Sequence, residues 1–102
     1  MILRELADAV DAGVPVASAT VVRTRRSVPR HAGSRMLVYA DGRTSGTIGG
    51  GEMERRVTAE AVAALADGRP RMSSHSLVDP SGGDPGVCGG EVEIYVEPHM
   101  PA

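Results

Sequence analysis

The sequence contains no phenylalanine and no tryptophan, and tyrosine occurs only twice, at Tyr39 and Tyr95. Proteins that bind RNA or single-stranded DNA by base stacking depend on aromatic side chains, so the composition argues against this class of function. The core of the 102-residue chain must be built from Val, Leu, Ile, Met and Ala. This length predicts one domain, and the 41% hydrophobic content argues against disorder of the whole chain.

Lysine is absent as well, so all 11 basic residues are arginines, whose planar guanidinium groups bind phosphate and carboxylate through two parallel hydrogen bonds. The net charge of −2 argues against a general polyanion binder, and we expect no nucleic-acid partner. The charge is unevenly distributed along the chain. Residues 23–35 hold five arginines and no acid, whereas residues 77–102 hold five acids and no arginine.

Cys88 is the one cysteine in the sequence, which excludes an intrachain disulfide. Charges interrupt residues 1–8 before a signal-peptide core forms, and no hydrophobic run approaches the length of a membrane span. We therefore expect a cytoplasmic protein that does not associate with membranes. The three histidines lack metal-ligand spacing, so the sequence predicts no metal site.

Hydrophobic periodicity predicts two helices, over residues 2–12 and 52–66, because apolar residues recur there at helical spacing. Strand-like patterns occupy residues 16–24, 34–40, 43–48, 71–78 and 91–97. Asp41-Gly42 predicts a two-residue hairpin turn, since such a turn requires positive φ. We therefore expect an α/β (α+β) fold, with a mixed β-sheet of about five strands and two packed helices in a single domain.

A glycine-rich junction lies between the predicted hairpin, residues 34–48, and the second predicted helix. Gly49, Gly50 and Gly51 would let backbone N–H groups approach a ligand at a helix N-terminus, where partial positive charge attracts anions. The spacing matches neither a P-loop nor a Rossmann fingerprint. The junction is therefore either an anion site or a corner at which the hairpin and the helix pack closely.

Two further segments are open to a functional and a structural interpretation. Arg25, Arg26, Arg30 and Arg35 surround a predicted Pro-Gly loop, and they either clamp a phosphate or form a solvated, positively charged loop that pairs with the acidic C-terminal strand. Cys88 precedes Gly89 and Gly90, and is either a reactive thiol or a small buried residue.

The ordered combination of these segments resembles the N-terminal domain of the XdhC/CoxI family across nearly the whole chain. The residues that carry the resemblance are Ala19-Thr20-Val21-Val22-Arg23, Ser27-Val28-Pro29-Arg30-His31-Ala32-Gly33-Ser34-Arg35, Gly46-Thr47-Ile48-Gly49-Gly50-Gly51-Glu52-Met53-Glu54 and Cys88-Gly89-Gly90-Glu91-Val92. Such proteins are accessory factors for molybdenum hydroxylases of the xanthine dehydrogenase or CO dehydrogenase type. Members bind molybdopterin, protect the cofactor while its sulfido ligand is installed, and help to deliver it to the apo-enzyme.

The resemblance implies a maturation factor for the molybdenum cofactor, with or without a nucleotide extension, and not a turnover enzyme. It implies that phosphate rests on the amides of residues 49–51 and that Arg30 and Arg35 steady it. Glu54 would bind the pterin or order the loop, and Cys88, Gly89 and Gly90 would lie near the metal end.

The sequence departs from the family pattern at two positions. Many CoxI-like members have a cysteine where this chain has Glu52, and a small residue where it has Arg26. Cys88 is therefore the one thiol left to contact molybdenum. The C-terminal Rossmann-like domain that is common in the family does not follow, so we expect residues 1–102 to form one XdhC/CoxI-like domain that acts as a homo-oligomer or with a partner.

The expected partners are an apo-molybdenum hydroxylase and a sulfurase of the cysteine desulfurase type. Two rival functions remain open at this stage. One is an interaction module that docks a hydroxylase or a sulfurase without binding cofactor. The other is a hydrolase or transferase that acts on a small phosphorylated substrate.

Overall fold

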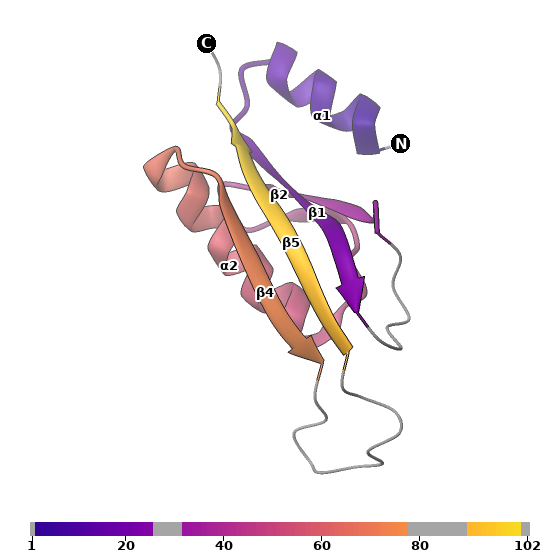
Figure 1. Cartoon of the computed structure of the whole chain (residues 1–102). Helices are drawn as coiled ribbons and strands as arrows, with labels where there is room; N and C mark the ends of the chain where they lie inside the picture. Colours follow the sequence, from indigo (N-terminus) through magenta and orange to yellow (C-terminus); the bar gives the residue numbers. More distant parts are fainter. Residues whose placement is uncertain (1, 26–31, 78–89, 101–102) are drawn as a thin grey trace.

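The computed structural model describes residues 2–25, 32–77 and 90–100. Their elements follow one another as α1 (Ile2–Asp11), β1 (Val16–Arg25), β2 (Arg35–Tyr39), β3 (Thr44–Gly46), α2 (Gly51–Asp67), β4 (Arg71–Leu77) and β5 (Gly90–His99). Both predicted helices and all five predicted strands are present (Figure 1). The α+β fold class is therefore confirmed.

The five strands form one sheet in the order β3-β2-β1-β5-β4. Every neighbouring pair is antiparallel, whereas the sequence led us to expect a mixed sheet. The reason lies in the connection through α2, which links edge strand β3 to the opposite edge strand β4 and so creates no neighbouring parallel pair.

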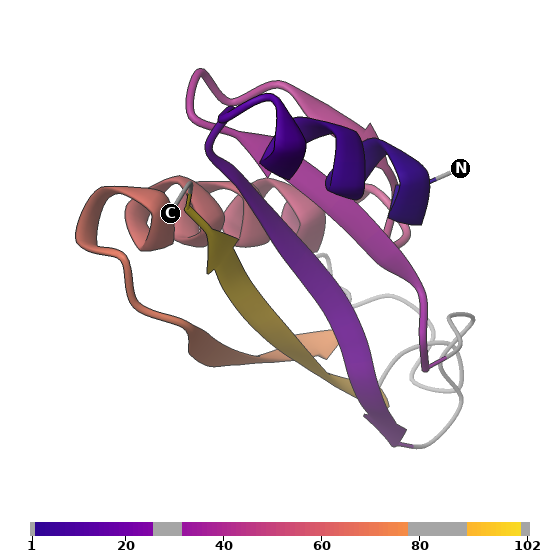
Figure 2. The ribbon, with the colours of Figure 1, turned by 90° about the horizontal axis from the view of Figure 1, so that it is seen from above.

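The two helices pack on opposite faces of this sheet, as the alternation of buried residues along β2 shows. Met36 and Val38 belong to the core cluster beneath α2, together with Val57 of that helix. Leu37, between them, packs with Ala9 of α1 in a second, smaller cluster. In the view of Figure 2, strand β1 (purple) runs between α1 (indigo) and α2 (salmon). Helix α2 therefore covers a large area of one face of the sheet, and α1 covers a small area of the other.

The β2–β3 hairpin differs in one detail from its prediction. The amide of Tyr39 donates to the carbonyl of Arg43, so the loop holds three residues, 40–42, and not two. Gly42 has φ 89°, the left-handed residue that such a loop requires. The Asp41 carboxylate accepts a hydrogen bond from the Arg43 amide at 3.0 Å, which stabilises the longer turn.

Strand β5 extends further than residues 91–97, because Pro98 and His99 also pair with β1. Strand β4 begins at the pair Arg71–Val96, so β5 has no neighbour on that side beyond Val96. Proline is tolerated where one side of a strand is unpaired. Within the described residues, neither helix is long and apolar enough to cross a membrane.

Candidate functional site

The described residues that flank two of the sequence motifs lie at the same end of the sheet as the glycine junction. Strand β1 ends there at Arg25, which pairs with Glu91 near the start of β5, and Leu77 at the end of β4 pairs with Gly90. The N-terminus of α2 lies at the same end, the lower one in Figure 1. The fold therefore brings the glycine junction close to the described residues that flank the other two motifs.

The glycine junction has the left-handed backbone that its composition predicts. The φ angles of Gly49, Gly50 and Gly51 are 125°, 78° and 74°. A Cβ added at Gly50 or Gly51 would meet no atom within 4 Å, so no close backbone packing requires glycine at these two positions. At Gly50 and Gly51 this geometry supports an open surface rather than a close packing corner.

Glu54 holds the junction in place from the first turns of α2. Its Oε1 accepts hydrogen bonds from the Ile48 amide at 3.0 Å, the Gly50 amide at 3.1 Å and the Thr47 hydroxyl at 2.6 Å. The Gly49 amide in turn donates to the Thr47 hydroxyl oxygen at 2.9 Å. Of the two roles expected for Glu54, this geometry matches the ordering of the loop.

This network changes where an anion is able to bind. The amides of Gly49 and Gly50 already donate to Thr47 and Glu54, and Glu54 adds negative charge beside them. The N–H groups of the first helical turn have no acceptor within the helix, because it begins there. Gly51 opens that turn. The amides of the first turn of α2, rather than all three glycine amides, are therefore the backbone donors that an external anion would use.

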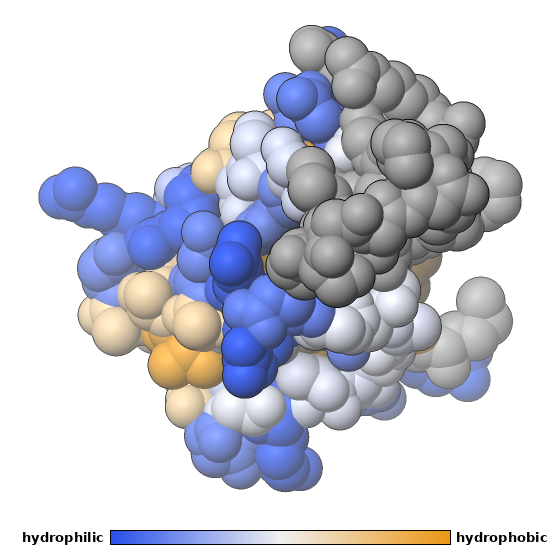
Figure 3. Space-filling model, turned by 90° about the horizontal axis from the view of Figure 1, so that it is seen from below, coloured by the Kyte–Doolittle hydropathy of each residue, from blue (hydrophilic) through white to orange (hydrophobic). Residues whose placement is uncertain are grey.

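Charges on the first turns of α2 are largely paired with one another. Glu52 forms ion pairs with Arg55 and Arg56, the latter at 3.3 Å. The described surface at this end of the molecule, seen from below in Figure 3, is mostly hydrophilic to neutral, with hydrophobic areas toward one side. Such a surface suits a polar or anionic ligand better than a broad apolar partner.

Arg35 lies away from the glycine junction. Its Nε donates to the Thr20 hydroxyl at 3.0 Å, across the β1–β2 pair. Its neighbour Met36 faces α2, so the Arg35 side chain lies on the other face of the sheet. The described conformation therefore does not bring Arg35 and the start of α2 together around one phosphate.

The remaining predicted site residues divide between the described and the undescribed parts of the chain. Gly90 is buried at the start of β5. Arg30, Cys88 and Gly89 lie outside the described residues. Sequence reasoning missed Thr47, although a threonine two residues before a glycine is typical of a hydroxyl that caps a turn.

Comparison with known proteins decides the family. A sequence model described as the XdhC and CoxI family matches residues 9–82. The chain belongs to the XdhC and CoxI family. This result confirms the resemblance that the motifs carry.

Two longer proteins are similar to this member of the family. The uncharacterized protein YqeB of Escherichia coli (strain K12) is 39% identical over 100 residues, which cover 96% of this chain and 18% of YqeB. A crystal structure described as a xanthine dehydrogenase (BH1974) from Bacillus halodurans is 26% identical, with a TM-score of 0.76 over 96% of this chain and 30% of that one. The chain thus spans less than a third of either relative.

Proposed function

We propose that this domain binds the molybdenum cofactor and acts in the maturation of a molybdenum hydroxylase. The family is one of accessory and maturation factors, and the similarity to a protein described as a xanthine dehydrogenase supports a role linked to these enzymes. The observation that carries the proposal is the start of α2. There, three left-handed glycines open a helix N-terminus at the same end of the sheet as the described residues that flank the other motifs.

The residues present fit the anionic part of such a cofactor. Gly50 and Gly51 leave open space where a side chain would stand, and the first-turn amides of α2 supply donors for a phosphate. Glu54 keeps the loop in shape, so that these donors are arranged before the ligand arrives. Arg30 supplies positive charge, and Cys88 is the thiol for the metal end.

When bound, the cofactor supplies the molybdenum and the pterin dithiolene on which the hydroxylase depends. This chain contributes binding, orientation and shielding from water. The apo-hydroxylase and a sulfurase of the cysteine desulfurase type are the proposed partners, and we place the activity in the cytoplasm. The proposed role is that of a carrier and not of a turnover enzyme.

One observation favours the rival function of a docking module without cofactor. The Glu54 carboxylate already occupies two amides of the glycine loop, as an internal substitute for an external anion. In that case the loop is a rigid surface feature that a hydroxylase or sulfurase recognises.

Binding of isolated molybdopterin to Gly51→Ala and Gly68→Ala separates the two functions. Both glycines border α2, have φ near 70° and lie in open space, so both substitutions impose the same backbone strain. We expect Gly51→Ala to weaken binding at least tenfold and Gly68→Ala to leave it unchanged. Equal affinity in the two variants would favour the docking module.

A further inference from the structure

Strand β4 presents a long open edge. Its seven residues pair with β5 on one side, and it is the last strand of the described sheet (Figure 1). Exposed edges are usually protected from pairing by proline, lysine, bulges or short length. Strand β4 contains neither proline nor lysine, and its pairing with β5 is regular throughout. Apart from the charge of Arg71 at its start, the strand therefore lacks the features that prevent an edge from pairing with another chain.

The opposite edge of the sheet is protected. Strand β3 has three residues only. At its end, a Cβ on Gly46 would lie 2.7 Å from Ile2 of α1, which shows how closely the helix approaches this strand. The difference between the two edges singles out β4 as the surface for a partner strand.

We propose that the open edge of β4 pairs antiparallel with β4 of a second copy of this chain, about a two-fold axis at Ser74. This register uses all seven residues, since Ser74 is the middle residue of Arg71–Leu77. A two-fold contact of this kind closes after two copies, and it covers both open edges. The result is a continuous ten-stranded sheet.

Residue pairing in this register is favourable. Arg71 falls opposite residue 77, which is uncharged, so no like charges meet across the strands. Ser73 falls opposite His75 of the second copy, so two polar side chains meet there. A register centred on Ser73 would instead place Arg71 opposite His75 and would use five residues only.

Cysteine cross-linking tests the register directly. Ser74 and Ser76 are both exposed and lie on the same face of β4. In a Cys88→Ser background, Ser74→Cys places two thiols directly opposite each other at the axis, within reach of a disulfide. The matched variant Ser76→Cys places them four residues apart along the strands, roughly 14 Å, which is too far. The Cys88→Ser variant alone, which has no cysteine, is the negative control.

We expect a disulfide-linked dimer from Ser74→Cys under mild oxidation and none from Ser76→Cys. Sedimentation equilibrium supplies a second measurement without cysteine. The wild-type chain should dimerise reversibly. Ser74→Asp should weaken the dimer severalfold, because it places like charges opposite each other. Ser76→Asp should not weaken it, because residue 76 lies opposite Met72 of the second copy. A monomeric wild-type chain, equal cross-linking of both variants, or preferential cross-linking of Ser76→Cys would overturn the proposal.

Discussion

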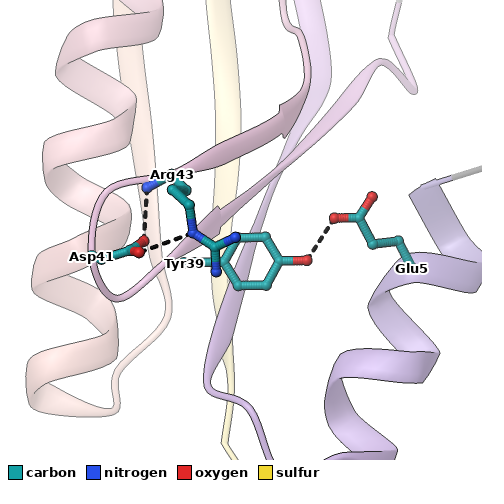
Figure 4. A network of polar contacts seen from close by, with 4 residues as sticks. All are labelled: Glu5, Tyr39, Asp41 and Arg43. Carbon is teal, nitrogen blue, oxygen red and sulfur yellow. Dashed lines mark hydrogen bonds and ion pairs between the residues drawn. The ribbon is translucent and has the colours of Figure 1, made fainter.

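The carboxylate of Glu5 accepts a hydrogen bond from the hydroxyl of Tyr39 at 2.5 Å, which ties α1 to the β2–β3 hairpin (Figure 4). The same carboxylate accepts a second hydrogen bond from Ser45 at 2.6 Å. Arg43, which pairs with Asp41, lies over the Tyr39 ring with its guanidinium carbon 4.8 Å from the ring centre. This network holds α1 on the less covered face of the sheet.

The first prediction concerns the pH dependence of this contact. Hydrogen bonds from Ser45 and Tyr39 hold the pKa of the Glu5 carboxyl below its ordinary value of 4.5. The stabilisation is therefore present above that value and is lost as the pH falls through the lowered pKa. Glu5→Gln should melt at a lower temperature than wild type at pH 7, and the difference between the two should be smaller at pH 3.

Asp8→Asn, an exposed change on the same helix, is the control for this experiment, and it should shift the melting temperature little at either pH. A difference between Glu5→Gln and wild type that persists unchanged at pH 3 would contradict a role for the Glu5 charge.

The second prediction compares two left-handed glycines of the hairpin. A Cβ on Gly46 would lie 2.7 Å from the Ile2 side chain and 2.9 Å from the Arg35 carbonyl oxygen, whereas one on Gly42 would meet nothing within 4 Å. Gly46→Ala should lower the free energy of unfolding by roughly 2–4 kcal/mol, from strain and overpacking together. Gly42→Ala should lower it by roughly 1–2 kcal/mol, from strain alone. Urea denaturation of both variants checks this order, and equal losses would show that the contact with Ile2 is unimportant.

The third prediction tests the role of Glu54 in the glycine junction. Glu54→Ala removes the acceptor of the Ile48 and Gly50 amides, which should lower the free energy of unfolding by about 1–3 kcal/mol. Glu52→Ala, two residues earlier, removes surface ion pairs and should change it by no more than about 0.5 kcal/mol. Chemical denaturation measures both, and hydrogen exchange at Gly50 should accelerate in Glu54→Ala alone. Slow exchange at Gly50 in that variant would mean that the loop does not depend on the carboxylate.

The fourth prediction separates the two arginines that the family resemblance singles out. Arg30→Ala should weaken the binding of molybdopterin by roughly 1.5–3 kcal/mol, the range for a lost hydrogen bond to a charged group. Arg35→Ala should weaken it less, because Arg35 donates to Thr20 on the face opposite α2. Isothermal titration measures both affinities. A larger loss in Arg35→Ala would show that the cofactor binds on the α1 face of the sheet.

Much of this fold is predictable from the sequence, because periodicity acts locally. Met53, Val57 and Ala61 recur every four residues, and all three lie in the core beneath α2. The antiparallel pairing of β1 with β5 is not predictable in the same way. It joins residues some 75 positions apart, and no local pattern specifies which strands become neighbours.

The candidate site shows the same division between local and long-range information. The positive φ of Gly49, Gly50 and Gly51 follows from their residue type. The sheet face on which Arg35 lies depends on the register of β2 against β1, which the arginine-rich composition of the loop does not reveal. The internal use of the loop amides by Glu54 likewise depends on how the chain folds back, six residues from Ile48.

The most direct test of cofactor binding is purification of this chain from a molybdenum-replete host, followed by oxidation and fluorescence detection of the pterin. We expect a fluorescent pterin in stoichiometric proportion to the wild-type protein, strongly reduced in Gly51→Ala and retained in Gly68→Ala. Protein that carries no pterin, and that also fails to bind isolated molybdopterin added in excess, would contradict the proposed function.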